Sequence, residues 1–317
     1  MRFRLPDPDA RYSAVRLSSD LPAHEFARDN GEWRLELTEP VQRLEYQFEV
    51  VLEDGETETL LDPGNPNTAP GAFGDKSVLV ASGYEEPAWL EAPRVEGARS
   101  TVTTKGRGFG GGLEIEVWRP ADTDPDEPLP LLVAHDGPEY DSLSRLTDFA
   151  AAKIHSGELP PHRVALLPAG ERNEWYSASA RYTRILLERL LPAVTDTPPA
   201  AIGASLGALA LLYAERQHPG TFSALFLQSG SFFMPRYDAH EIRFPYYHQI
   251  VGFVKQVQRV EVPTVLTCGA AEENIHNNRA MAETLDAPLH ELGDTHNYTA
   301  WRDAFDPHLT RLLAGVW

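Results

Sequence analysis

Residues 200–211 read AAIGASLGALAL, and the pentapeptide Gly203-Ala204-Ser205-Leu206-Gly207 within them decides the fold. The pentapeptide has the form G-x-S-x-G, with an apolar run before it and a run of good helix formers after it. A strand that turns sharply into a helix at a serine exposes the serine hydroxyl, and this context is typical of a nucleophile elbow. We expect Gly203 and Gly207 to leave room for the turn and for close packing of the helix on the strand.

The composition limits the partners of the chain. Its 317 residues suggest about two domains, and 42% of them are hydrophobic, so a sizeable core can form. Lys and Arg number 28 against 47 Asp and Glu, which gives a net charge of −19. This charge repels nucleic acid and anionic membranes and disfavours multiply anionic substrates.

The single Cys268 excludes an intrachain disulfide. The N-terminal residues do not resemble a secretion signal and no apolar run reaches membrane-spanning length, so we expect a cytoplasmic protein.

Two regions differ in their patterning. Residues 1–88 alternate apolar and polar side chains between turn signals, which predicts a small immunoglobulin-like β-sandwich. Within it, a hairpin is expected between Tyr46–Leu52 and Thr57–Leu61 around Asp54-Gly55. Residues 89–98 are interpreted as a linker.

Residues 99–317 alternate strand-like and helical runs, which predicts an α/β domain with a mostly parallel sheet flanked by helices. Together with the elbow, this pattern predicts an α/β-hydrolase fold. The glycine-rich Lys105–Gly112 leads into a strand rather than a helix, so we expect a flexible hairpin turn there and not a phosphate-binding loop. The expected strands are Leu113–Trp118, Leu129–Ala134, Arg163–Leu167, Ala200–Ile202, Ser223–Gln228, Thr264–Cys268 and Pro288–Leu292, and the expected helices are Leu146–His155, Ala178–Val194, Asn278–Leu285 and Trp301–Leu313.

A serine nucleophile needs a base within hydrogen-bond reach and an acid that orients the base. In this fold class the three follow one another in the order serine, acid, histidine. His296 lies in the loop before the last helix and is the expected base. Glu272 is the expected acid because it lies three residues after Gly269, with Glu273 as the alternative. It stays open whether both glutamates are solvated and a Ser–His pair suffices.

A tetrahedral intermediate also needs an oxyanion hole. The backbone N–H of Leu206, directly after the serine, is one expected donor. The second is expected in the loop after strand 129–134, where Pro138 has no N–H. Gly137 and Glu139 are therefore the two candidates, between which the sequence does not decide. Packing roles are expected for the neighbouring His135 and Asp136.

Taken together, five segments resemble the enterochelin esterase-like branch of the α/β-hydrolases over about residues 128–315. They are HDGPEY, GERNEWYS, GASLGALAL, CGAAEENIHNNRAMAETL and GDTHNYTAWRDAF. The segment LDPGNPNTAPGAFG is similar to the early-set, starch-binding-like β-sandwich that precedes this catalytic domain in enterochelin esterases. The resemblance implies Ser205 as nucleophile, His296 as base, Glu272 as acid and Arg172 as a substrate-holding residue, with a surface ion pair to Glu174 as the alternative for Arg172. The net charge departs from what a triply anionic siderophore substrate would favour.

Aromatic side chains near the predicted strand ends suggest an aromatic-lined cleft for a bulky or aromatic ester. The residues expected to line it are Tyr140, Trp175, Tyr176 and Phe233, next to a long aromatic-rich connection over residues 234–260. The alternative is that many of these rings pack in the core.

The sequence therefore predicts a serine carboxylic-ester hydrolase that acts on a small-molecule ester, with no cofactor and no metal. The oligomeric state is left open, a homodimer included. An acyltransferase that uses the same triad remains an alternative. So does a non-catalytic carbohydrate-binding or partner-binding protein, for which Trp33, Tyr46 and Trp89 are the aromatic rings that sugars could stack on, with core positions the simpler expectation.

Overall fold

The computed structural model describes residues 1–72, 74–104 and 112–317. The expected glycine-rich turn at Lys105–Gly112 thus lies outside the described residues, except for its last position. The chain divides into two compact units. The first contains Met1–Glu85 together with Gly269–Glu273 and Glu291–Ala300, and the second contains Glu86–Cys268, Asn274–His290 and Trp301–Trp317. The domain boundaries expected from the sequence stay a prediction, because two loops from the C-terminal part of the chain group with the first unit.

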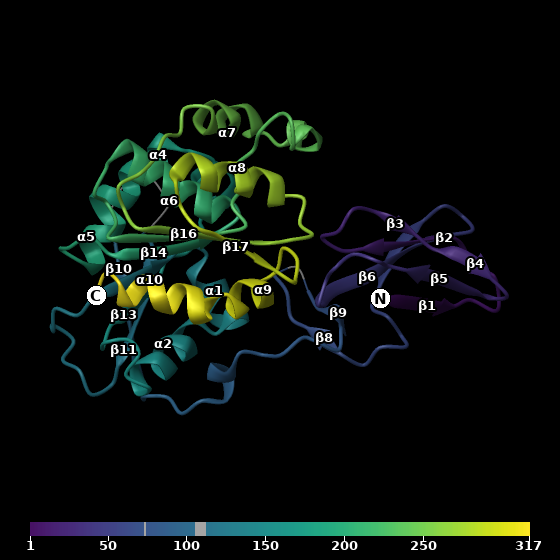
Figure 1. The fold of residues 1–317 in the computed structure, drawn as a ribbon, viewed down its shortest axis with the longest axis horizontal. Coiled ribbons are helices and arrows are strands. Elements are labelled where there is room, and N and C mark those ends of the chain that lie inside the picture. The colour runs from purple at the N-terminus through teal and green to yellow at the C-terminus, as the bar shows by residue number, and fades with distance from the viewer. Residues whose placement is uncertain (73, 105–111) are drawn as a thin grey trace. The chain divides into compact units, whose positions relative to one another are not determined.

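The first unit is built from two antiparallel sheets (Figure 1). One sheet has the order β1 (Arg2–Pro6), β5 (Glu32–Glu36), β4 (Ala27–Asp29). The other has the order β3 (His24–Glu25), β2 (Tyr12–Ser18), β6 (Arg43–Leu52), β9 (Lys76–Val80), β8 (Thr68–Ala69), and β7 (Thr57–Leu60) also pairs with β6. The antiparallel β6–β7 pair, with Val51 opposite Thr57, confirms the expected hairpin.

Aromatic side chains fill the core of this unit. The rings of Phe3 and Tyr46 meet edge to face with centroids 4.8 Å apart, and those of Phe26 and Phe48 do so at 5.2 Å. Such contacts add to the stabilisation that burial of the rings provides. Trp33 and Tyr46, which are only 6% and 1% exposed, lie in this core. Trp89, which is 3% exposed, is buried in the second unit against Phe149 and Phe305. Core positions are thus confirmed for all three. These rings therefore offer no platform for a sugar.

Tyr46 also anchors the proline-rich and asparagine-rich loop that follows β7. Its hydroxyl donates to Asp62 Oδ2 at 2.6 Å and accepts from Asn65 Nδ2 at 3.0 Å. Burial, and next the Asp62 carboxylate, raises the pKa of Tyr46, so the hydroxyl keeps its proton and remains a donor. Asp62 Oδ1 in turn accepts the N–H of Gly64 at 2.7 Å. One buried hydroxyl thus links the loop to the central strand of the sandwich.

An eight-stranded sheet forms the centre of the second unit. Its order is β10 (Gly97–Thr103), β11 (Glu114–Pro120), β13 (Arg163–Leu166), β12 (Leu131–Ala134), β14 (Ala200–Ala204), β15 (Ala224–Gln228), β16 (Thr264–Gly269), β17 (Leu289–Leu292). The β10–β11 and β11–β13 pairs are antiparallel, and the pairs from β13 to β16 are parallel. Strands β12, β14 and β15 are buried at every position, as expected of parallel strands with helices on both faces. This architecture confirms the α/β-hydrolase fold.

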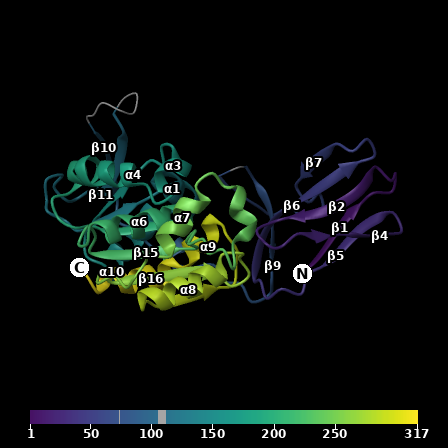
Figure 2. The same ribbon diagram turned by 90° about the horizontal axis from the view of Figure 1, so that it is seen from above.

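Helices cover both faces of this sheet. Figure 1 shows α6 (Leu206–Gln217), α7 (Tyr247–Val254) and α8 (Ile275–Leu285) above it, and α2 (Leu146–His155) and α10 (Thr310–Ala314) below it. Figure 2 shows the upper layer from above. The remaining α-helices of the described residues are α1 (Gly137–Ser144), α3 (Arg172–Tyr176), α4 (Ala180–Ile185), α5 (Leu191–Val194) and α9 (Tyr298–Asp303). Short 3-10 helices span Ala88–Glu91 and Ala239–Arg243.

Two expected helices differ in detail from the structure. The helix expected over 178–194 consists of α4 and α5 joined by the π-helical segment Leu186–Leu190. The single final helix expected over 301–313 is wrong, because Asp306 has the extended dihedral angles φ −113° and ψ 122°. A residue before proline disfavours the helical conformation, and Pro307 follows Asp306.

We expect the Tyr46→Phe variant to loosen the loop at residues 62–67. The change leaves the buried ring in place but removes the hydroxyl from Asp62 and Asn65, which should cost about 1–3 kcal/mol of unfolding free energy. Hydrogen exchange followed by mass spectrometry should show faster deuterium uptake in this loop. Tyr12→Phe, in the same core, is the control, and equal uptake in the two variants would contradict the anchoring role.

Candidate active site

Ser205 lies at the junction of β14 and α6, in the second unit. Its backbone has φ 56° and ψ −123°, a conformation that non-glycine residues rarely adopt. The neighbouring backbone holds this conformation, because Ser205 N–H donates to Gln228 O at 2.9 Å and Ser231 N–H donates to Ser205 O at 3.1 Å. The strained strand-to-helix turn expected from G-x-S-x-G is therefore present.

The glycines on either side make this turn sterically feasible. A Cβ at Gly203 would lie 2.8 Å from the carbonyl carbon of Gly207, which is closer than real Cβ contacts allow. A Cβ at Gly207 would lie 3.3 Å from His135 Cβ. The first glycine is thus required for contact between strand and helix. The second allows a close approach of α6 to the loop after β12, where a side chain would be a tight fit.

Ser231 is a polar neighbour of the nucleophile that the sequence analysis missed. Its Oγ lies 3.1 Å from Ser205 Oγ, and its side chain is buried. The two serines are 26 residues apart, and only the pairing of β14 with β15 brings their loops together. The sequence QSGS after an apolar run is a weak signal for such a role.

The loop after β12 forms a buried polar cluster next to the elbow. The Asp136 carboxylate, whose side chain is 3% exposed, accepts bonds of 2.9–3.1 Å from Nε and Nη2 of Arg172. Arg172 therefore pairs with Asp136, and Glu174 instead pairs with Arg181 at 2.8 Å. Among the alternatives for Arg172, the surface ion pair with Glu174 is wrong. The bonds to Asp136 hold the Arg172 guanidinium in a fixed orientation beside the elbow loop.

His135 connects this cluster to helix α6. A carbonyl can only accept, so the His135 Nδ1 that lies 3.1 Å from Gly207 O carries the ring proton. Nε2 then accepts from the Tyr182 hydroxyl at 2.9 Å. Burial lowers the pKa of His135 to about 4, so the ring is neutral near pH 7. The packing role expected for His135 is confirmed.

One expected oxyanion donor is wrong. The N–H of Gly137 already donates to Leu167 O at 2.9 Å, so it does not face a substrate. The glycine is needed for a steric reason, because a Cβ there would lie 2.3 Å from Leu166 Cα. Glu139 and Leu206 each lie in the first turn of a helix, where backbone N–H groups have no acceptor within the helix. They remain the candidate donors.

Glu272 and His296 meet in the first unit. Glu272 Oε2 lies 2.9 Å from His296 Nδ1, and Glu272 Oε1 accepts the N–H of Gly269 at 2.8 Å. The Glu272 side chain is 2% exposed and the His296 side chain 28% exposed. A carboxylate on Nδ1 fixes the tautomer with the proton on Nδ1, which leaves Nε2 as the basic nitrogen. The alternative acid Glu273 is exposed.

A buried arginine holds the His296 loop, and the sequence analysis missed it. Arg43 Nη1 lies 3.0 Å from Asp294 Oδ2, and its Nη2 lies 2.7 Å from Glu45 Oε1. All three side chains are 7% exposed or less. Burial raises the pKa of Asp294, and the Arg43 charge opposes this rise. In addition, Gln42 N–H donates to Gly293 O at 2.6 Å. The loop is thereby bonded to strand β6.

The aromatic residues expected to line a cleft lie inside the protein. Tyr140 and Tyr176 are 0% exposed and Trp175 is 2% exposed, so the expectation that these three contact substrate is wrong. Tyr140 donates to Gln228 Oε1 at 2.9 Å, and the Trp175 ring stacks on Tyr182 at 5.3 Å. Substrate contact stays a prediction for Phe233 (6% exposed) and Arg172.

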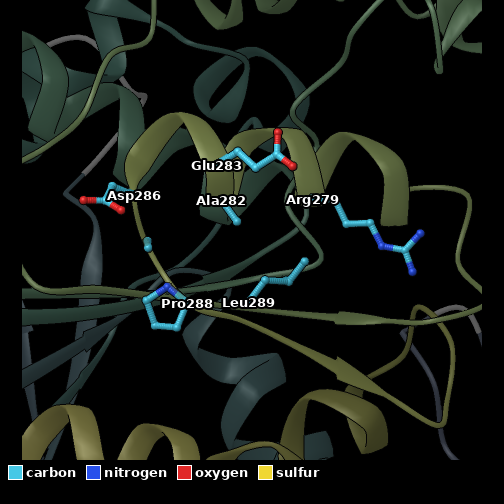
Figure 3. A pocket seen from close by; sticks show the side chains of 7 residues that line it. Arg279, Ala282, Glu283, Asp286, Pro288 and Leu289 are labelled. Atoms are coloured by element: carbon cyan, nitrogen blue, oxygen red, sulfur yellow. The ribbon is translucent and has the colours of Figure 1, made fainter.

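A shallow hollow of about 510 Å³ lies between α8 and the start of β17. Figure 3 shows the helix on one side and Pro288 and Leu289 on the other. Its lining consists of Arg279, Ala282, Glu283, Asp286, Ala287, Pro288 and Leu289. None of the expected site residues is among them, so this hollow does not contribute to the candidate site.

Within residues 1–72, 74–104 and 112–317, no helix has the length and apolar character needed to cross a membrane. Over the same ranges, no cluster of three or more His, Cys, Asp or Glu side chains is arranged to hold a metal ion.

Comparison with known proteins gives one family and a set of similar structures. A family model described as "Putative esterase" matches residues 107–312, a range that includes Ser205, Glu272 and His296. A search of curated protein sequences found no match.

Solved esterase structures share the fold. The enterobactin esterase of Shigella flexneri, determined in the presence of enterobactin, aligns with a TM-score of 0.72 at 19% identity over 100% of this chain and 92% of its own. The ferric enterobactin esterase of Salmonella typhimurium aligns with a TM-score of 0.71 at 18% identity over 100% and 93%. A ferulic acid esterase aligns with a TM-score of 0.59 at 14% identity over 70% and 100%.

We expect Arg43→Met to destabilise the first unit by about 3–5 kcal/mol. The variant would leave the buried carboxylates of Glu45 and Asp294 without a counter-charge. Arg16→Met is the matched control, since Arg16 makes exposed ion pairs on the neighbouring strand β2 and should cost at most about 1 kcal/mol. Urea-induced unfolding of both variants measures the difference, and equal losses would contradict the assignment.

Proposed function

Because the chain belongs to the Esterase family, we propose that it is a serine carboxylic-ester hydrolase that works through a covalent acyl-enzyme at Ser205. The observation that carries the proposal is the backbone of Ser205, at φ 56° and ψ −123° between β14 and α6. A serine in this strained turn presents its hydroxyl beyond the end of the sheet. The lack of room for a Cβ at residue 203 also supports the proposal, because the close contact of strand and helix there is what makes the turn at Ser205 so sharp.

His296 is the proposed general base and Glu272 the proposed acid. The 2.9 Å contact between Glu272 Oε2 and His296 Nδ1 supports this pair, because it leaves Nε2 free of a proton. Chain order supports the partnership with Ser205, since serine, acid and histidine follow one another as they do in other α/β-hydrolases.

In the proposed reaction, Ser205 Oγ forms a bond to the ester carbonyl carbon while His296 Nε2 takes the hydroxyl proton. The bond from the carbonyl carbon to the alcohol oxygen then breaks, and the imidazolium returns the proton to the departing alcohol. Water, deprotonated by the same imidazole, then attacks the acyl carbon. The bond from that carbon to Ser205 Oγ breaks, the imidazolium returns its proton to Ser205 Oγ, and the carboxylic acid leaves. Glu272 remains ionised and stabilises the imidazolium throughout.

The proposed oxyanion hole consists of the N–H groups of Leu206 and Glu139. Both belong to first turns of helices, where the positive end of the helix dipole also favours a developing negative charge. Gly137 is excluded because its N–H donates to Leu167.

An aromatic acyl ester is the proposed substrate. One similar structure was determined in the presence of 2,3-dihydroxy-N-benzoyl-serine, and another protein of this fold is a ferulic acid esterase, which supports an aromatic acyl group in the proposed substrate. The Arg172 guanidinium, oriented by Asp136, is the proposed contact for an oxygen of the substrate. The net charge of −19 argues for a substrate with little negative charge. Phe233 remains a proposed contact, and a cytoplasmic location and a homodimer remain predictions.

Replacing the nucleophile tests the proposal directly. Ser205→Ala should lower kcat for p-nitrophenyl butyrate or benzoate by about 10⁴-fold or more, since the acyl-enzyme no longer forms. Ser142→Ala, on the exposed side of α1, should keep full activity. Equal rates for wild type and Ser205→Ala would refute the proposal, and transfer of the acyl group to added alcohol in preference to water would favour a transferase.

The two neighbouring glutamates allow a matched test of the acid. Glu272→Gln should lower kcat by about 10³–10⁴-fold with a small effect on KM, because the amide no longer fixes the tautomer or stabilises the imidazolium. Glu273→Gln makes the same chemical change one residue away, at an exposed position, and should retain activity. If Glu273→Gln were the more damaging variant, the acid would be misassigned. Similar rates for all three proteins would instead indicate a Ser–His pair.

A further inference from the structure

A cavity of about 640 Å³ lies at the amino ends of the parallel strands of the second unit. Leu129–Leu131 lead into β12, Arg163 begins β13, Thr197 and Pro198 precede β14, and Ser223 precedes β15. Ser205 follows the carboxyl end of β14, whereas the cavity lies at the amino ends of the strands. The cavity and the nucleophile are therefore at opposite ends of the parallel strands. The cavity is thus a feature separate from the proposed catalytic centre.

Arg163 is the cation in the lining of this cavity, and among the described residues it forms no ion pair. Its Nε is buried and has no hydrogen-bond partner, and no carboxylate within the described parts of the chain forms an ion pair with it. Burial lowers the pKa of Arg163, which is the effect expected of a desolvated charge without an opposing carboxylate. Leaving a half-buried guanidinium in this state costs free energy unless a ligand or water compensates it.

Ser223 is a second unsatisfied polar group in the same cavity. Its Oγ is buried and makes no hydrogen bond within the part of the chain that the structure describes. In the strand register, Val164, Leu132, Ala200 and Ala224 lie side by side across four strands. Arg163 and Ser223 each precede a member of this row by one residue, so they lie in the adjacent row, at opposite ends of it. Arg163 and Ser223 thus lie three strands apart, about 14 Å between backbones.

The walls between these two groups are apolar and the surroundings are acidic. Five prolines belong to the apolar lining, together with Leu131 and Trp317. The prolines are Pro125, Pro128, Pro130, Pro192 and Pro198. Asp126, Glu127 and Asp196 also line the cavity, and these carboxylates repel a ligand with several negative charges.

We propose that this cavity binds an elongated monocarboxylate with an apolar or aromatic middle, its carboxylate on Arg163 and a hydrogen-bonding group at its far end on Ser223. The planar guanidinium matches a carboxylate in two parallel hydrogen bonds. The long Arg163 side chain covers part of the separation, so a ligand of about 10 Å would reach from the guanidinium to Ser223. Proline faces and an indole ring suit a flat apolar body.

Isothermal titration calorimetry with 4-hydroxycinnamate tests the site, because this probe has the charge, length and terminal hydroxyl that the cavity requires. Wild type should bind it, whereas the neutral 4-hydroxycinnamamide and the tricarboxylate citrate should not bind measurably. Benzoate, which is too short to reach Ser223, should bind more weakly. The same series on Ser205→Ala shows that binding is independent of catalysis, so failure of the proposed function would not affect the outcome.

Variants locate the binding. Arg163→Gln should weaken binding of 4-hydroxycinnamate at least about tenfold, and Ser223→Ala a few-fold. Arg184→Gln, which removes an exposed arginine on α4 that does not line the cavity, should bind as wild type does. Arg163→Lys keeps the positive charge but lacks the planar guanidinium, so its affinity should fall between those of wild type and Arg163→Gln. This second variant keeps the test valid if Arg163→Gln does not fold. Absence of binding to wild type, or equal affinity in wild type and both Arg163 variants, would overturn the proposal.

Discussion

The contact between β14 and α6 at Gly203 and Gly207 is the constraint on which the second unit depends. With 2.8 Å between a hypothetical Cβ at residue 203 and the Gly207 carbonyl carbon, no side chain fits between strand and helix. The chain therefore turns within one residue, and that residue, Ser205, is forced to positive φ. A non-glycine residue in such a conformation costs about 1–3 kcal/mol, which the surrounding structure must offset. The fully buried β14 and the backbone bonds from Ser205 to Gln228 and Ser231 provide that support.

A different constraint governs the proposed base and acid. The loops that carry Glu272 and His296 belong to the same compact unit as the β-sandwich, and the Arg43–Asp294 pair and the Gln42–Gly293 bond tie one of them to strand β6. Arg43 is nearly fully buried, so its two carboxylate partners have little freedom to move away from it. This unit therefore contributes to the position of His296, in addition to any role of its own. A buried charge cluster restricts geometry more than a hydrophobic contact would, because its members must keep their hydrogen bonds.

How far the sequence predicts this site depends on the range of the interactions. The elbow is predictable because the need for glycine and for a strand and helix around Ser205 is local. His296 and Glu272 follow from chain order, and the structure brings these two together. Gly137 is a wrong prediction because the direction of one N–H depends on backbone dihedrals that the residue type does not determine. Arg43 was missed because its partner Asp294 lies 251 residues away.

The aromatic residues show the same limit for side chains. Tyr140, Trp175 and Tyr176 follow strand ends in sequence, where both core rings and cleft rings occur, and only packing distinguishes the two. Tyr176 stacks on His135 at 4.7 Å, and a Cβ at Gly170 would lie 2.3 Å from the Trp175 ring, so these rings fill the protein interior. Polarity gives a sharper criterion than aromaticity, because a buried ring needs no partner whereas a buried charge does. Arg163 is half-buried, and its buried Nε meets that criterion, since the atom has no hydrogen-bond partner among the described residues. In a chain with 47 acidic residues and a net charge of −19, carboxylates are abundant, yet none of those described pairs with Arg163. An arginine left unpaired among so many acids, at the end of a strand and beside a cavity, is better explained by a ligand than by packing.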